Sequence, residues 1–234
     1  GVDRWYFISW DNDSVLKEEY EFFRENTYER SWDYGIFTYT DTVLFDRILK
    51  SESCRQDLDQ AVEDLRSHYL TEEAVAHRIQ EYSSLVQKYL YTLPDRTFAR
   101  VTEEDYQILA DHMAGEIEKN YEYYQESTQS VWPFHILSPE RENGKILLNW
   151  EDGYLFEDGT VTYQVELSRD YSFRDCIVKT SIWENRYEAG ELPAGQYFLR
   201  VRATGENGIL QDAYEYYRTE EGSGCYSTLC FYIL

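Results

Sequence analysis

The chain contains 234 residues, which is enough for one large domain or two domains of ordinary size. A hydrophobic fraction of 42%, with 17% aromatic residues, supplies enough core to exclude a wholly disordered chain. The 45 acidic and 22 basic side chains give a net charge of −23, which argues against binding to nucleic acid or to an anionic membrane surface. No apolar run approaches the roughly 18 residues that a membrane-spanning helix needs.

The most informative stretch is the aromatic run from Arg4 to Trp10, which ends at Asp11 and Asp13. Aromatic and β-branched residues at this density predict a strand buried on both faces. Two carboxylates at the end of a rigid strand suit a divalent cation such as Mg²⁺, which prefers oxygen ligands. Asp-Asn-Asp is also good turn chemistry, and Asp-x-Asp is too common a pattern to decide between a metal site and a hairpin turn.

The same run resembles the Trp-Tyr-Phe-Ile-Pro-Trp-Asp-x-Asp signature of the CotH family, spore-coat proteins that are atypical protein kinases. The matching positions are Trp5, Tyr6, Phe7, Ile8, Trp10, Asp11 and Asp13. Ser9 stands where the family usually has proline. The resemblance implies that Asp11 is the principal Mg²⁺ ligand and Asp13 the second, in the role of the DFG aspartate of ordinary kinases, with ATP as the phosphoryl donor.

Residues 11–40 show no regular spacing of apolar residues and are rich in aromatic and acidic side chains. We expect an irregular connection that packs beside the strand, since a connection of this length inside a domain is uncommon and often functional. In the CotH family, the corresponding region follows the metal motif and helps to wall the active site. The resemblance therefore implies the same role for this connection.

Helical periodicity begins at Asp41 and predicts four helices, over residues 43–50, from Ser51 or Ser53 to Tyr69, from Thr71 to Leu90, and from Thr102 onward. The longer three carry apolar stripes. These stripes contain Leu58, Ala61, Val62, Leu65 and Tyr69; Val75, Ile79, Tyr82, Val86, Tyr89 and Leu90; and Tyr106, Leu109, Ala110, Met113, Ile117, Tyr121 and Tyr124. Short links between amphipathic helices favour an antiparallel helical bundle. The phrase from Leu44 to Arg55 also resembles the CotH family, so the resemblance covers roughly residues 4–125.

After Val131-Trp132-Pro133-Phe134, apolar residues recur at every second position. We expect short strands near residues 146–150, 161–167, 177–178, 196–203 and 226–234, which together are typical of a β-sandwich. Residues 134–234 resemble fibronectin type III domains. Trp150 matches the core tryptophan of the second strand, and the phrase from Leu192 to Ala203, with Tyr197, matches the tyrosine corner.

The segment from Ile209 to Gly224 departs from the fibronectin pattern, because it is an enlarged, acidic loop rich in tyrosine. Tyr214, Tyr216 and Tyr217 could stack on a sugar or a peptide. A solvated insertion explains the same residues. The sequence does not select between these interpretations.

The cysteines and histidines lack the spacing of a metal site. Cys225 and Cys230 are too far apart in one extended strand to bond to each other, which favours free thiols at Cys54, Cys176, Cys225 and Cys230. A pairing of Cys54 across domains remains open. The histidines are expected to be ordinary surface or packing residues.

Together these patterns predict an α+β chain in two parts, a mostly helical CotH-like part over residues 1–130 and a fibronectin type III-like sandwich over residues 134–234. The resemblance implies ATP- and Mg²⁺-dependent phosphoryl transfer to protein in a longer parent, at the bacterial cell surface or outside the cell. The sequence has no glycine-rich phosphate loop and no strand lysine, and the catalytic-loop aspartate is expected upstream of Trp5. We therefore expect an excised fragment that is inactive alone and retains no cofactor tightly. The alternative is a non-catalytic extracellular scaffold whose sandwich binds protein or glycan.

Overall fold

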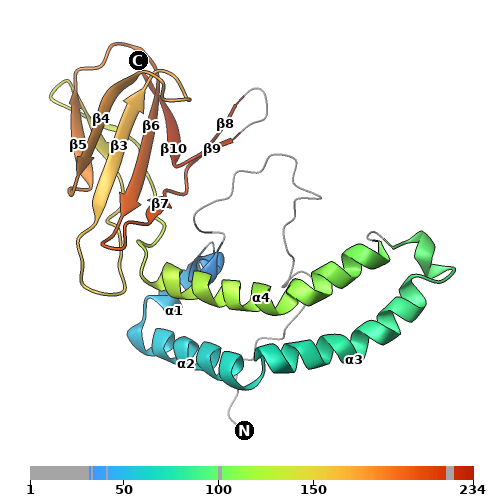
Figure 1. Ribbon diagram of the computed structural model, residues 1–234. Helices are drawn as coiled ribbons and strands as arrows, with labels where there is room; N and C mark the ends of the chain where they lie inside the picture. Colours follow the sequence, from blue (N-terminus) through green and yellow to red (C-terminus); the bar gives the residue numbers. More distant parts are fainter. Residues whose placement is uncertain (1–31, 33, 41, 100–101, 220–223) are drawn as a thin grey trace, which may run out of the picture. The chain divides into compact units, whose positions relative to one another are not determined.

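The computed structural model describes residues 32, 34–40, 42–99, 102–219 and 224–234. Helices occupy the first half of the described chain and antiparallel strands the second half, so the predicted α+β class is confirmed (Figure 1). The chain divides into two compact units. The described residues of the first are 57–99 and 102–120, and those of the second are 32, 34–40, 42–56, 121–219 and 224–234. These units are defined by contacts and not by family boundaries, so the predicted division into residues 1–130 and 134–234 stays a prediction.

The four predicted α-helices are present, as α1 (Val43–Leu49), α2 (Glu52–His68), α3 (Glu72–Leu90) and α4 (Glu103–Thr128). Two short 3₁₀ helices, η3 (Gly35–Tyr39) and η4 (Asp95–Thr97), precede α1 and α4. Helix α3 begins where the sequence predicts, because the Thr71 hydroxyl accepts a hydrogen bond from the Ala74 amide at 3.2 Å. This bond satisfies one of the amide groups that a helix start leaves without a helical partner.

Within the first unit, polar contacts link segments far apart in the sequence. The Tyr91 hydroxyl donates to the Thr102 carbonyl at 2.9 Å, and Arg66 forms an ion pair with Glu118 at 2.8 Å. Most positions of the apolar stripes are not fully covered, and Tyr69, Tyr82 and Tyr89 are each more than half exposed. Among the helical residues described in this unit, Val75 and Ala110 are the buried hydrophobic ones. Amphipathic spacing therefore predicted the helices correctly, but it did not predict which stripes would be covered.

The second half of the chain forms two main antiparallel sheets and a hairpin (Figure 1). One sheet has the order β1-β2-β5, from β1 (Glu140–Glu142), β2 (Lys145–Asn149) and β5 (Arg186–Gly190). The other has the order β10-β6-β3-β4, from β3 (Thr162–Ser168), β4 (Cys176–Ile182), β6 (Gly195–Thr204) and β10 (Thr228–Ile233), with β7 (Leu210–Asp212) paired to β6. Strands β8 (Tyr216–Arg218) and β9 (Gly224–Tyr226) form the hairpin.

A single hydrophobic core joins these two sheets. Leu148 of β2, Val165 of β3 and Val201 of β6 are fully buried, as period-two alternation requires when one face of each strand points inward. The core also contains Trp150, which is 1% exposed. All the strands predicted from alternation within this region are present, and the sequence pattern missed the short strands β1, β5, β7, β8 and β9.

The connection before β6 is fixed by Tyr197. Its ring is buried, and its hydroxyl donates to the Pro193 carbonyl at 2.7 Å and accepts from Arg169 at 2.8 Å. A buried phenol needs hydrogen-bond partners, so this side chain ties the turn at Pro193 to the start of the strand. This arrangement has the hydrogen bonding of a tyrosine corner.

Candidate functional site

The predicted metal ligands, Asp11 and Asp13, lie outside the described residues. Within the part of the chain that the structure describes, no group of three or more histidine, cysteine, aspartate or glutamate side chains is placed to hold a metal ion. The assignment of Asp11 and Asp13 as Mg²⁺ ligands therefore stays a prediction. All four cysteines are described and none forms a disulfide, and burial raises the pKa of the Cys225 thiol.

The three tyrosines predicted to line a ligand-binding loop are described, but their rings do not form one platform. The centre of the Tyr214 ring lies 5.1 Å from the centre of the Trp32 ring and 4.8 Å from that of His135. Tyr216 is 46% exposed and packs on Tyr226 at 4.6 Å. The ring of Tyr217 contacts Phe198, at 4.9 Å, and Tyr171, at 6.0 Å. Of the three, Tyr216 offers the most exposed ring.

Trp132, which lies between α4 and β1 in the sequence, is a buried aromatic side chain with both polar and aromatic partners. It is 2% exposed, and its indole N–H donates to Asp46 Oδ1 at 2.6 Å. Phe37 and Phe156 approach its ring nearly edge-on, with centroid distances of 5.4 and 5.3 Å. The Lys50 ammonium lies 5.1 Å from the centre of the ring. Each of these geometries is favourable, because a buried indole needs an acceptor and aromatic faces attract ring edges and cations.

A cavity of about 420 Å³ lies beside this tryptophan, a size within the range of small-ligand pockets. Thr40, Val43, Asp46, Lys50, Pro133, His135, Glu151 and Tyr214 line it. Its charged groups already have partners. Lys50 pairs with Asp46 at 3.0 Å, and Glu151 accepts a hydrogen bond from the His135 amide at 2.9 Å. The cavity therefore combines apolar walls with polar groups that are held in place.

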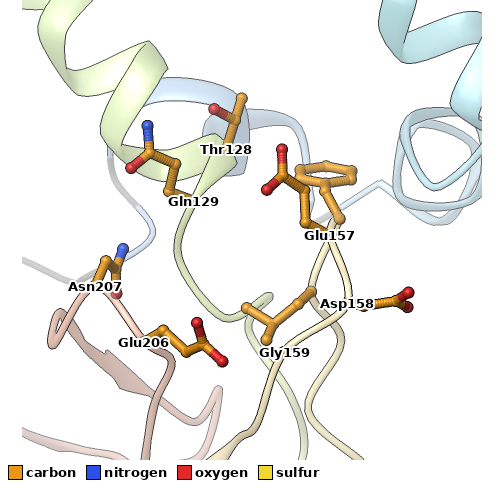
Figure 2. Close-up of a pocket in the computed structure, with 9 residues that line it drawn as sticks. Thr128, Gln129, Glu157, Asp158, Gly159, Glu206 and Asn207 are labelled. Atoms are coloured by element: carbon orange, nitrogen blue, oxygen red, sulfur yellow. The ribbon is translucent and has the colours of Figure 1, made fainter.

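A second cavity, of about 320 Å³, lies between the end of α4 and the β2–β3 connection (Figure 2). It is lined by three carboxylates, those of Glu157, Asp158 and Glu206. Figure 2 shows that the Asp158 carboxylate points away from the other two and that Glu157 and Glu206 do not meet. The three acids therefore do not converge on one point as ligands of a cation would.

The outer face of the larger sheet carries a network of ion pairs around Glu166 of β3. This carboxylate is 4% exposed and contacts Arg200 at 2.5 Å, Lys179 at 3.0 Å and Arg202 at 3.5 Å. Burial by itself would raise the pKa of Glu166, but the hydrogen bonds and charges of Lys179 and Arg200 outweigh burial and hold the pKa below its usual range. The network therefore stays ionised at neutral pH.

Sequence reasoning treated residues 131–134 as a boundary and missed the contact between Trp132 and Asp46. A signal was available, because segments that join domains are usually polar and exposed, whereas this one is Val-Trp-Pro-Phe. The structure buries all four residues. Asp46 gave no such signal, since an aspartate in a helix is ordinarily a solvated residue.

The family relationship of the chain rests on its first half. The family model described as CotH kinase protein matches residues 1–124, which is more than half of the 234 residues. This range contains the Trp-Asp-x-Asp stretch, helices α1 to α3 and most of α4. No protein of curated function and no solved structure matches the chain significantly. The chain belongs to the CotH kinase family.

Proposed function

We propose that this chain is the carboxyl-terminal part of a CotH-like protein kinase, which in its complete form transfers phosphate from ATP to a protein hydroxyl. The observation that carries the proposal is the family match over residues 1–124, which begins with the Trp-Asp-x-Asp stretch. The 234 residues lack a glycine-rich phosphate loop, and the lysines of the described strands, Lys145 and Lys179, lie outside the family match. Residues 1–234 alone therefore bind nucleotide weakly and do not catalyse transfer.

Asp11 is the principal metal-binding residue in this proposal and Asp13 the second. When bound, Mg²⁺ would neutralise the charge that develops on the transferred phosphate. The role proposed for Asp11 is to supply a carboxylate oxygen to the cation, because oxygen ligands are those that Mg²⁺ prefers. Asp13, two positions later in the sequence, offers a second oxygen.

The test is phosphoryl transfer from labelled ATP by the complete natural polypeptide that contains this chain. Asp11→Asn should lower transfer by at least about 100-fold, because it removes the ligand charge but keeps the side-chain volume. Asp13→Asn should have a smaller effect, and Asp158→Asn, a matched change in the connection between β2 and β3, should have none. Full activity of Asp11→Asn would disprove the metal assignment. Turnover by the isolated 234 residues would disprove their predicted inactivity.

For residues 134–234 we propose a fibronectin type III-like sandwich, with the domain division at residues 130–134. The sheet orders β1-β2-β5 and β10-β6-β3-β4 support it, as do the buried Trp150 and the hydrogen bond from Tyr197 to Pro193. An ordinary role of such modules is contact with other proteins or glycans. The second candidate function is therefore non-catalytic binding at the cell surface, and the exposure of Tyr216 favours it.

Binding of the whole chain to immobilised glycans and matrix proteins tests this second function. Tyr216→Ala should abolish binding, whereas Tyr232→Ala, which removes a 66% exposed ring from β10, should leave it intact. Equal binding by both variants would exclude the tyrosine loop as the contact. A location at the bacterial surface or outside the cell belongs to the same proposal. In the described parts of the chain, none of the helices has the length and apolar character needed to cross a bilayer.

A further inference from the structure

We propose that the last turns of α4, together with residues 131–234, the β-region, act as a brace for residues 34–50, which follow Asp13 in the sequence, and that Trp132 is the positioning residue of this brace. The segment lies inside the family match, whereas Trp132 lies outside it. The brace itself stands on contacts within one compact unit. Its consequence for nucleotide handling rests on the proposed function.

The first group of contacts joins α1 to Trp132. Asp46 accepts the indole N–H at 2.6 Å, and the same carboxylate pairs with Lys50 at 3.0 Å. The Lys50 ammonium lies over Trp132, at 5.1 Å, and over Tyr154, at 5.6 Å. The indole therefore has one acceptor in a set direction and a cation above its face, so its position fixes the rotation of α1 about its axis.

A second, independent group of contacts holds η3 against the last turns of α4. The Ile36 amide donates to Ser127 Oγ at 2.9 Å, and Ile36 is fully buried. Gly35 has a φ of +60°, and a Cβ at this position would collide with Ser127 Oγ and with the Tyr123 carbonyl, the latter at 2.5 Å. Only glycine permits so close an approach of the two backbones.

A third group fixes the two ends of the segment. Trp32, before it, is 7% exposed and packs edge-on against Tyr214 at 5.1 Å and Tyr226 at 5.6 Å. Arg55, after it, lies 4.4 Å from the centre of the Phe156 ring. Buried contacts of this kind show that residues 34–50 share a core with the β-region. A domain joined by a flexible tether would not hold both ends of this segment.

Amide hydrogen exchange of the whole 234-residue chain tests the brace. Trp132→Phe keeps a ring in the site and removes the N–H, so exchange at residues 36–49 should become about 10-fold faster while β3 and β6 keep their protection. Trp132→Ala should accelerate the same amides by about 100-fold or more. The matched control is Trp183→Phe, because Trp183 is 76% exposed. It should leave residues 36–49 unchanged.

A double-mutant cycle tests whether the Asp46 bond carries the effect. Asp46→Ala and Trp132→Phe each remove one partner, so the double variant should exchange at residues 36–49 no faster than the faster single variant. If the increases in exchange rate of the two single variants multiply in the double variant, the two residues act separately and the assignment of Trp132 is overturned. Unchanged exchange in Trp132→Phe would overturn the brace as a whole. If Trp132→Ala does not fold, the Phe variant and the cycle decide.

The complete natural polypeptide then links the brace to the proposed kinase function. Trp132→Phe should raise the KM for ATP about threefold or more, with a smaller change in kcat, because the segment after the metal motif is less well positioned and not chemically altered. If the unmodified polypeptide transfers no phosphate, the proposed function fails and the exchange experiment still decides the brace. If transfer occurs but Trp132→Phe leaves KM and kcat unchanged, the link to nucleotide handling fails.

Discussion

Gly35 shows how one residue can determine a contact between distant segments. Its φ of +60° is a left-handed conformation that disfavours any side chain, and the space above it is filled by Ser127 and the Tyr123 carbonyl. Gly190 has a similar φ of +77° but no atom within 4 Å of the position that a Cβ would take. Alanine substitutions at Gly35 and Gly190 therefore share the cost of backbone strain, and only the substitution at Gly35 adds a steric collision.

We predict that Gly35→Ala lowers the free energy of unfolding by about 3 kcal/mol or more, whereas Gly190→Ala lowers it by about 1 kcal/mol. Both substitutions pay the backbone strain, and only the first also forces η3 away from α4. Urea unfolding followed by far-UV circular dichroism measures the difference. Equal losses of unfolding free energy in the two variants would show that the close approach of η3 to α4 does not contribute to stability.

Glu166 is the residue whose ionisation should matter most for the β-region, because it is buried among three cations. Its folded-state pKa lies below its unfolded value, so its stabilising effect is complete above the unfolded pKa. The effect is lost as the pH falls through the folded pKa. Acidification below the unfolded-state pKa of Glu166 should therefore weaken this sheet.

We predict that Glu166→Gln lowers the free energy of unfolding by about 1–3 kcal/mol at pH 7 and that the difference from the unsubstituted chain shrinks below about pH 4. Glutamine keeps the volume but cannot balance Arg200 and Lys179. Urea unfolding from pH 3 to pH 7 measures both chains. Gln164→Glu, on the same strand, is a control for a change of charge alone. A difference that does not vary with pH would mean that the ionised carboxylate is not the source.

At the scale of single elements, α4 shows that helical pattern and burial are separate properties. The helix runs from Glu103 to Thr128, yet Ala110 is the buried hydrophobic residue among its described positions within the first unit. It also carries Gly115 in an exposed interior position where an added Cβ would meet no atom within 4 Å. Glycine in a helix interior costs stability relative to alanine because the unfolded chain is more flexible.

We predict that Gly115→Ala stabilises the first unit by about 0.5–1 kcal/mol. The reverse change one residue earlier, Ala114→Gly, should destabilise it by a similar amount. Thermal unfolding followed by circular dichroism at 222 nm reports both variants. A loss of stability in Gly115→Ala would indicate that the glycine is needed for a contact and is not simply a weak helix former.

For the whole molecule, the net charge of −23 sets the response to salt. Repulsion among carboxylates opposes the compact state, and added salt screens it. Salt screens the ion pairs of Glu166 less, because the Glu166 carboxylate is buried. Screening of the general repulsion should therefore dominate.

We predict that raising NaCl from 20 to 300 mM, concentrations chosen because the Debye length falls from about 20 Å to about 6 Å, raises the apparent Tm by about 3–6 °C. The increase should level off at higher salt, since the Debye length is then shorter than the spacing between surface charges. Differential scanning calorimetry measures the change, with sorbitol at matched osmolality as the control. A Tm that falls with salt would mean that ion pairs outweigh the general repulsion.

Much of the architecture follows from local patterns that the sequence displays directly. Helical spacing predicted α1 to α4, and the Thr71 cap predicted the start of α3. Alternation predicted β2, β3, β6 and β10, because a strand with one buried face must alternate. The phrase around Pro193 and Tyr197 predicted a corner whose hydrogen bond is present. The Trp-Asp-x-Asp stretch indicated the CotH family, which the match over residues 1–124 confirms.

Burial and partnership were decided by the tertiary structure, because they depend on residues far apart in the sequence. Tyr82 and Trp132 are both aromatic, yet Tyr82 is 55% exposed and Trp132 is 2% exposed. The difference is that Trp132 meets Asp46, 86 positions earlier, along with Phe37 and Phe156. Local periodicity encodes which face of an element is apolar, whereas the element that covers that face is chosen by the packing of the whole chain.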